Sequence, residues 1–145
     1  MDDIKKRARE RAKKLGLPYA GALLPAEAHA LMKKGAKLVD VRTNAELHFV
    51  GSVPGSELIE WNTYPEGHRN PAFLEELAEA VRKDAPMMFL CRSGVRSHHA
   101  AIAATEAGWT EAYNILEGFE GDKDAGGHRN VAGGWKFARL PWVQS

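Results

Sequence analysis

The stretch Met87-Met88-Phe89-Leu90-Cys91-Arg92-Ser93-Gly94-Val95-Arg96-Ser97 leads from an apolar run into the only cysteine of the chain and then into a polar segment. The apolar run predicts a buried strand, and the alanine-rich residues after Ser97 predict a helix. Backbone amides at the N-terminus of a helix attract anions, because their N–H groups lack partners and the helix dipole adds positive potential. Such surroundings also stabilise a thiolate, the nucleophilic form of cysteine. The stretch therefore predicts a reactive Cys91 in an anion-binding loop.

A single cysteine is more often buried and inert, so the neighbours of this thiol decide the interpretation. Arg92 and Arg96 flank it with positive charge, and Gly94 allows the backbone to bend toward it. The hydroxyls of Ser93 and Ser97 add hydrogen-bond donors. Because a structural cysteine requires none of these neighbours, we favour a reactive thiol.

Composition and charge exclude several classes of protein. The chain has 145 residues, of which 44% are hydrophobic and 27% charged, and these values fit one globular domain. The formal net charge of +1 gives no reason to expect a nucleic-acid partner. No apolar run approaches the roughly 20 residues that span a bilayer, and the N-terminus lacks the apolar core of a signal peptide and carries Asp2, Asp3 and Glu10. We therefore expect a cytoplasmic protein without a membrane partner, and we predict no metal and no cofactor.

Short apolar strands alternate with helices, which is typical of a parallel α/β sheet. Strands are predicted at residues 37–42, 57–61, 86–90 and 111–116. Helices are predicted at residues 2–15, 25–35, 71–81 and 97–107, with one helical turn capped by Thr43 or Asn44. The fold class is therefore α/β, with a central, mostly parallel sheet of about five strands and helices on both faces. Ligands bind such sheets at the carboxyl ends of the strands, where Cys91 falls.

The stretch Cys91-Arg92-Ser93-Gly94-Val95-Arg96, followed by Ser97, resembles the active-site loop of a single-domain rhodanese, a sulfurtransferase. Motifs in the family's order and spacing support this resemblance: Leu38-Val39-Asp40-Val41-Arg42 with Glu46, Gly51-Ser52-Val53-Pro54-Gly55-Ser56, Asn114-Ile115-Leu116-Glu117-Gly118-Phe119, Gly133-Gly134-Trp135 and Leu140-Pro141-Trp142. The chain departs from the family at Ser52, where histidine is usual, and at Arg139, where glycine is common. The resemblance covers roughly residues 21–142. It implies a rhodanese domain at residues 21–145, preceded by a basic N-terminal helix and extension at residues 1–20.

The resemblance also implies a mechanism. Cys91 would be the catalytic residue, taking sulfane sulfur from a donor such as thiosulfate and passing it, as a persulfide, to cyanide or a thiol. The loop would bind the substrate and hold the charge of the persulfide through Arg92, Ser93, Gly94, Val95, Arg96 and Ser97. Within it, Arg92 would bind the sulfonate of the donor and Arg96 would brace the loop. Because the chain has one cysteine, the persulfide must be discharged by another molecule.

Three alternatives stay open. The chain could be a persulfide carrier that serves a sulfur-relay protein, or an interaction domain without catalysis. It could also resemble tyrosine phosphatases and arsenate reductases, which place five residues between the cysteine and the arginine. Here four residues separate Cys91 from Arg96, and the shorter loop favours sulfur over a tetrahedral oxyanion.

Four further residues are candidates for supporting the site or lining its pocket. Asp40 and Arg42 end a predicted strand at the same sheet edge as Cys91, and we interpret them as a turn-stabilising ion pair. Glu46 is a further candidate partner of Arg42. Trp61 also follows a predicted strand, and its ring could form a pocket wall or belong to the core.

Two histidines, His98 and His99, fall in the first turns of the helix after the loop. Adjacent helical residues do not face each other, so joint metal binding is not expected. One of the two could modulate Cys91.

Overall fold

The computed structural model describes residues 2–144, so residues 1 and 145 at the ends of the two predicted segments lie outside it. Five parallel strands form one sheet in the order β1-β5-β4-β2-β3. The strands are β1 (Gly21–Leu23), β2 (Lys37–Asp40), β3 (Glu57–Leu58), β4 (Met87–Leu90) and β5 (Ala112–Ile115). The helices are α1 (Asp2–Leu15), α2 (Pro25–Lys33), α3 (Asn44–Phe49), α4 (Phe73–Ala80) and α5 (Val95–Glu106). The predicted α/β fold with a parallel sheet is confirmed.

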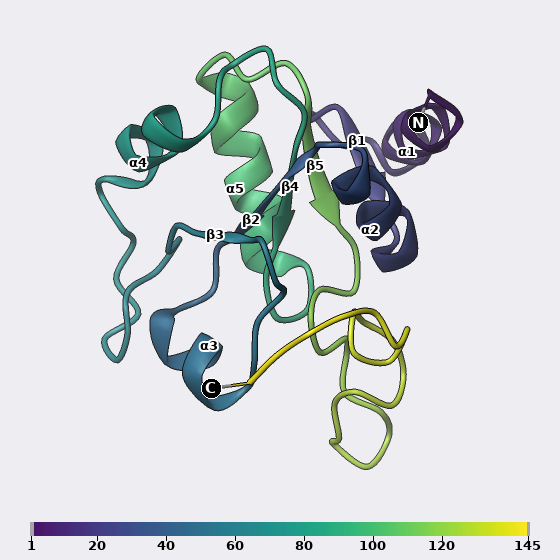
Figure 1. Ribbon diagram of the computed structural model, residues 1–145, viewed down its shortest axis with the longest axis vertical. Coiled ribbons are helices and arrows are strands. Elements are labelled where there is room, and N and C mark those ends of the chain that lie inside the picture. Colours follow the sequence, from purple (N-terminus) through teal and green to yellow (C-terminus); the bar gives the residue numbers. More distant parts are fainter. Residues whose placement is uncertain (1, 145) are drawn as a thin grey trace.

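Helices cover both faces of the sheet (Figure 1). Each central strand directs alternate side chains to opposite faces, so the apolar side chains on both faces are buried beneath helices. Met87, Phe89 and Cys91 belong to the core that contains residues of α4 and α5. Met88 and Leu90 belong to a second core that contains residues of α1 and α2. The continuous apolar run before Cys91 is therefore the middle of the protein, and it holds the cysteine at a fixed place on the sheet edge.

Three elements differ from the sequence prediction. The strand β1 was not located, since its three residues Gly21–Leu23 are too few to show a pattern. A Cβ at Gly21 would lie 2.8 Å from the ring of Tyr113 on the neighbouring strand, so this contact leaves no room for a side chain. The strand β3 has two residues instead of five. The helix α5 begins at Val95, two residues early, because Gly94 adopts the left-handed conformation that starts it.

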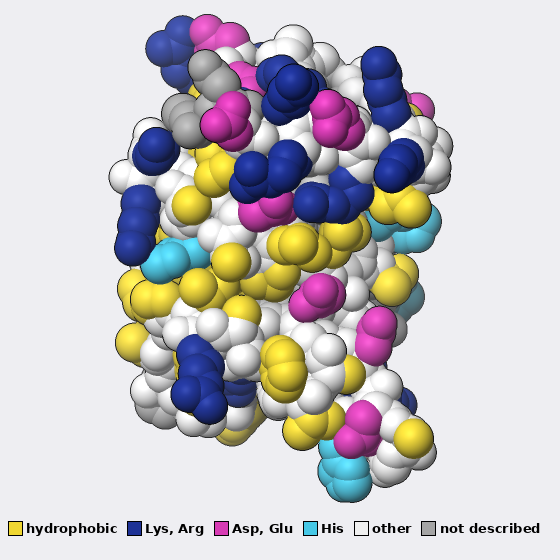
Figure 2. Space-filling model, turned by 90° about the vertical axis from the view of Figure 1, so that its right-hand side faces the viewer, with side chains coloured by type: hydrophobic (Ala, Val, Ile, Leu, Met, Phe, Trp, Pro, Cys, Tyr) yellow, Lys and Arg dark blue, Asp and Glu magenta, His cyan; other side chains and the backbone are white. Residues whose placement is uncertain are grey.

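The helix α1 packs against β1 and α2 at the rim of the sheet. Ala8 and Ala12 are buried there. Lys5 forms an ion pair of 2.8 Å with Glu111, and Arg11 forms one of 2.9 Å with Glu27. Figure 2 shows basic and acidic side chains interleaved in the upper half of this face. Among residues 2–144, no helix is both long and apolar enough to cross a membrane.

The segment after β5 covers the carboxyl ends of the strands in loops (Figure 1). The ring of Trp135 is completely buried in the second core, and its Nε1–H donates to the carbonyl of Pro141 over 2.8 Å. Val143 pairs with Ser52 as an isolated β-bridge. The segment is therefore an ordered cover over this edge of the sheet.

Candidate active site

Cys91 lies directly after β4, at the carboxyl edge of the sheet, with 1% of its surface exposed. The backbone N–H of Gly94 donates a hydrogen bond of 3.1 Å to its Sγ. Gly94 reaches this position with φ of 106°, a left-handed conformation that favours glycine, and it caps the N-terminus of α5. The sulfur thus lies against an amide donor and the positive end of a helix, which both stabilise negative charge on it.

The turn after β5 supports the backbone of the Cys91 loop through two hydrogen bonds. Phe119 N–H donates to the carbonyl of Cys91 over 2.8 Å, and Glu120 N–H donates to the carbonyl of Arg92 over 2.9 Å. A Cβ at Gly118 would lie 2.5 Å from the carbonyl oxygen of Cys91, so only glycine permits this approach. The carbonyls of Cys91 and Arg92 are thereby occupied, and the amide of Gly94 points toward the sulfur.

A buried chain of neutral hydrogen bonds lies on the inner side of Cys91. Ser97 Oγ lies 3.3 Å from Cys91 Sγ and 2.6 Å from the Oδ1 of Asn114. The Nδ2 of Asn114 donates to Tyr19 Oη over 3.4 Å, and Tyr19 Oη lies 2.7 Å from His98 Nδ1. Burial raises the pKa of Tyr19, partly offset by the bond from Asn114, while burial and the charge of His99 lower the pKa of His98. Both residues are therefore neutral near pH 7.

The outer side of the loop is charged instead. The guanidinium of Arg96 forms two parallel hydrogen bonds, of 2.8 and 2.9 Å, with the carboxylate of Glu46. The same carboxylate accepts from the amide and hydroxyl of Thr43, while Thr43 Oγ1 caps α3, so a capping box fixes Glu46 in place. Burial opposes the charge of Glu46, but Arg96 and Thr43 outweigh it and lower its pKa to about 2.

Arg96 also interacts electrostatically with Cys91. Burial would lower the pKa of its guanidinium, but the bonds and charge of Glu46, followed by the charges of Cys91 and Asp40, raise it. Arg96 thus interacts electrostatically with Cys91, although no hydrogen bond joins the two side chains.

Asp40 and Arg42 form a separate ion pair beneath the site. Both side chains are fully buried, with Arg42 Nη2 2.7 Å from Asp40 Oδ2 and 2.8 Å from the carbonyl of Gly51. The guanidinium carbon lies 4.2 Å from the centre of the Phe119 ring. The pair predicted from the sequence is therefore present. The suggestion that Glu46 joins Arg42 is wrong, because Glu46 faces Arg96 across the loop.

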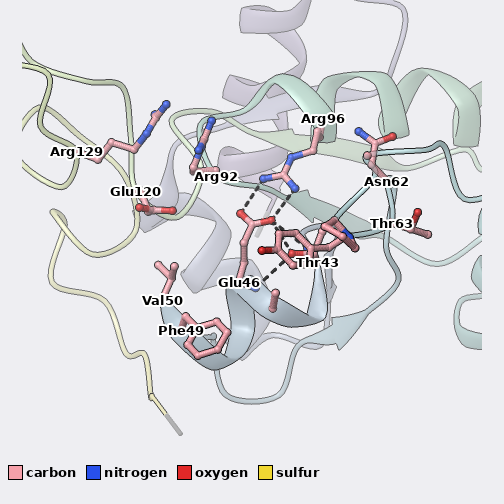
Figure 3. A pocket seen from close by; sticks show the side chains of 14 residues that line it. Thr43, Glu46, Phe49, Val50, Asn62, Thr63, Arg92, Arg96, Glu120 and Arg129 are labelled. Carbon is pink, nitrogen blue, oxygen red and sulfur yellow. Dashed lines mark hydrogen bonds and ion pairs between the residues drawn. The ribbon is translucent and has the colours of Figure 1, made fainter.

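An open pocket of about 650 Å³ lies outside the loop, between α3, the hairpin loop after β3 and the segment after β5 (Figure 3). Arg92 is exposed and lines it, together with Arg96 and Arg129. The remaining lining residues are Thr43, Ala45, Glu46, Phe49, Val50, Asn62, Thr63, Tyr64, Pro65, Gly67 and Glu120. Cys91 itself is buried and does not line this pocket, whereas Arg92 and Arg96 of its loop do.

The other predicted residues take different places. Ser93 is half-buried, Val95 is exposed at the start of α5, and Ser97 is buried against Cys91. Trp61 lies in the core, edge-on to Phe73 at 4.9 Å between ring centres. It does not line the pocket described above. Within residues 2–144, no three His, Cys, Asp or Glu side chains are grouped so that they could hold a metal ion.

Sequence reasoning missed three features of the site. Asn114 carries a signal, since it is a polar residue within the buried strand β5. Tyr19 carries none, because its place beside His98 depends on how the chain before β1 packs. Arg129 belongs to the glycine-rich segment and reaches the pocket only through the path of that segment.

Comparison with known proteins gives a family for this arrangement. The model of the rhodanese-like domain matches residues 24–125. An uncharacterised protein of Rickettsia rickettsii is 37% identical over 113 residues, which cover 74% of this chain and 82% of the relative. The thiosulfate sulfurtransferase GlpE of Haemophilus influenzae is 30% identical over 104 residues, covering 68% of this chain and 84% of that enzyme.

Among solved structures, the crystal structure of Rv0390 from M. tuberculosis is similar with a TM-score of 0.80. The two sequences are 45% identical, and the match covers 88% of this chain and 99% of that one. The family model accounts for the strand, loop and helix that present Cys91. This chain therefore belongs to the rhodanese-like domain family.

Proposed function

We propose that this chain is a thiosulfate sulfurtransferase, acting in the cytoplasm through a persulfide on Cys91. The observation that carries the proposal is the hydrogen bond of 3.1 Å from the Gly94 amide to Cys91 Sγ at the start of α5. An amide aimed at the only thiol, with helix dipole and arginines behind it, serves a sulfur that carries negative charge. The similarity to a thiosulfate sulfurtransferase of Haemophilus influenzae supports this activity.

Sulfur transfer from thiosulfate to Cys91 requires neither an oxidant nor a cofactor. The Cys91 thiolate attacks the outer sulfur of thiosulfate, a sulfur–sulfur bond forms, and the bond to the sulfonate breaks with sulfite as the leaving group. The negative charge passes from Sγ to the outer sulfur of the persulfide, where loop amides and Arg96 stabilise it. Cyanide or a thiolate then attacks that outer sulfur and returns Cys91 to the thiolate.

In this proposal the two arginines of the loop have separate roles. Arg92 is exposed at its wall, so its guanidinium is free to bind the sulfonate of the donor. Arg96 is held by Glu46 and braces the loop while adding positive potential. We place the donor between these two residues.

A second function is favoured by the size of the pocket. Its volume of about 650 Å³ lies in the range of drug-sized ligand sites and far exceeds what cyanide needs. Phe49 and Tyr64 are exposed beside the arginines, and aromatic residues and arginine are typical of protein-binding surfaces. The acceptor is then a cysteine of a sulfur-relay protein, and the chain works as a persulfide carrier.

Thiocyanate production tests the enzymatic proposal. The wild-type protein, mixed with thiosulfate and cyanide, is expected to form thiocyanate over many turnovers, and the Cys91→Ser variant is expected to form none above the uncatalysed rate. Slow turnover with cyanide and fast discharge by a protein thiol would favour the carrier. Equal rates for the wild type and the Cys91→Ser variant would overturn both functions.

A further inference from the structure

The hydrogen-bond chain on the inner side of Cys91 ends at a tyrosine that lies outside the matched family segment. Tyr19 precedes residue 24, at which the match begins, and it follows the helix α1. We propose that Tyr19 is a positioning residue, which holds the amide of Asn114 so that the Ser97 hydroxyl donates away from Cys91 and the persulfide is favoured over the free thiolate. The inference rests on the proposed function for its persulfide, while its hydrogen-bond directions rest on geometry alone.

The orientation of the Asn114 amide is decided by its two other neighbours. Its Nδ2 lies 3.3 Å from the carbonyl oxygen of Gly94 and 3.4 Å from Tyr19 Oη. If the amide were reversed, its Oδ1 would face the carbonyl of Gly94, and two acceptors would meet without a proton between them. The NH₂ group therefore points toward Gly94 and Tyr19, and the Oδ1 points toward Ser97.

The direction of the Ser97 hydroxyl follows from that orientation. A carbonyl oxygen only accepts, so the bond of 2.6 Å to Asn114 Oδ1 uses the single proton of Ser97. Toward Cys91, 3.3 Å away, Ser97 then presents lone pairs and can only accept. The arrangement suits a Cys91 thiol that donates to Ser97, and it gives no hydrogen bond to a Cys91 thiolate from this side.

A persulfide removes this conflict, because its charge lies on the outer sulfur and the inner Sγ is neutral. The inner Sγ needs no donor from Ser97, and the outer sulfur is served by the amides of the loop. The free thiolate keeps the bond from Gly94 but faces the Ser97 lone pairs at 3.3 Å. The inner side of the site is therefore matched better to the persulfide than to the free thiolate.

Tyr19 completes the chain at its far end. Its hydroxyl accepts from Asn114 and lies at the hydrogen-bonding distance of 2.7 Å from the Nδ1 of His98, and hydrogen bonds linked in this way polarise one another. The chain before β1 fixes the tyrosine in place: Leu17 N–H donates to Ala12 in α1 over 2.9 Å, and Ala20 N–H donates to Ala112 in β5 over 3.1 Å. The N-terminal extension thus contributes directly to the setting of the active site.

The Tyr19→Phe variant tests this role with two measurements. The first is the ratio of persulfide to free protein by intact mass spectrometry, at a fixed ratio of thiosulfate to sulfite. The second is the pH midpoint of the alkylation rate of unloaded Cys91 with iodoacetamide. Loss of the Tyr19 hydroxyl weakens the hydrogen bond from the Ser97 hydroxyl to the Asn114 Oδ1. The Ser97 hydroxyl then rotates and donates to the Cys91 thiolate. We expect the persulfide ratio to fall about threefold and the alkylation midpoint to move to lower pH.

Tyr113→Phe is the matched control, because Tyr113 is a buried tyrosine on the opposite face of β5 whose hydroxyl donates to Glu111. It is expected to leave both measurements at the wild-type values. The His98→Phe variant removes the hydrogen-bond partner of the Tyr19 hydroxyl at a half-buried position, and it is expected to give smaller changes in the same directions.

The outcomes separate the inference from the function on which it rests. An unchanged alkylation midpoint in both Tyr19→Phe and His98→Phe, or equal shifts in Tyr113→Phe, would overturn the role of Tyr19. If wild-type protein takes up no sulfur, the proposed function fails, and the alkylation measurement alone still decides whether Tyr19 sets the state of the thiol. Faster alkylation at every pH with an unchanged midpoint indicates loosened structure and also overturns the inference.

Discussion

Two carboxylate–arginine pairs have their carboxylates, Asp40 and Glu46, close together in the sequence, yet the two pairs lie in opposite relation to the site. Asp40–Arg42 is completely buried below the sheet edge, and its guanidinium is tied to the carbonyl of Gly51. Glu46–Arg96 is about one-fifth exposed and faces the pocket beside Cys91. Both have the geometry of strong ion pairs, with closest distances of 2.7 and 2.8 Å.

The difference shows that the position of a pair, rather than its geometry, decides what it does. The buried pair joins the end of β2 to the loop at Gly51 through the hydrogen bonds of Arg42. Its contact with a more distant segment is the stacking of the guanidinium on the Phe119 ring. The outer pair joins α3 to the start of α5 across fifty residues of sequence. The charge of Cys91 contributes to the raised pKa of its arginine, Arg96. We interpret the first pair as structural, and the proposed function assigns the second pair to the active site.

The largest expected effect is the loss of stability in Arg42→Met. This change leaves the Asp40 carboxylate buried without its cation, which is expected to lower the free energy of unfolding by about 3–5 kcal/mol. Urea unfolding of the variant measures the effect. Arg82→Met is the control, because Arg82 pairs with Asp84 at the surface, where the loss of an ion pair matters little. A decrease for Arg42→Met as small as that for Arg82→Met would show that the buried pair is not structural.

The second effect appears in acid. The folded-state pKa of Glu46, about 2, lies below its ordinary value of 4.5, so its ionised form stabilises the folded state. That contribution is complete above about pH 5 and is lost as the pH falls toward 2, and its full size is at most about 3 kcal/mol. The Glu46→Gln variant should therefore lose less stability than the wild type between pH 5 and 2, as measured by urea unfolding at each pH. Parallel stability curves for the two proteins would contradict the account.

The third effect concerns activity. Arg96→Lys keeps the positive charge but loses the paired bonds to Glu46, since an ammonium cannot match a carboxylate with two parallel donors. We expect kcat/KM for thiosulfate to fall by about tenfold while the free energy of unfolding changes by about 1 kcal/mol or less. Arg82→Lys serves as the matched surface control. The comparison between the two pairs is broken if Arg96→Lys retains full activity.

Much of the framework could be predicted because its signals are local. The bounds of α1 follow from acidic residues at one end, Lys13 and Lys14 at the other, and Gly16 beyond. Thr43, one of two predicted caps, is the one observed, and the spacing from Thr43 to Glu46 is that of a capping box. The apolar run before Cys91 located the central strand and the sheet edge at which the thiol lies.

What escaped prediction depends on contacts between distant parts of the chain. Glu46 was given the nearby Arg42 as a partner, but the packing of α3 against the loop presents it to Arg96. The strand β1 has no pattern of its own and exists because Gly21 fits against Tyr113. The place of Tyr19 follows only from the docking of α1 and the turn after it. In each case the deciding partner is far away in the sequence.

The central claim is that Cys91 carries sulfur as a persulfide, and intact mass spectrometry tests it most directly. After incubation with thiosulfate and removal of excess reagent, the wild-type protein is expected to gain the mass of one sulfur atom, which cyanide then removes. The Cys91→Ser variant is expected to gain nothing under the same conditions. A wild-type protein whose mass is unchanged by thiosulfate, or a Cys91→Ser variant that gains the same mass, would contradict the account.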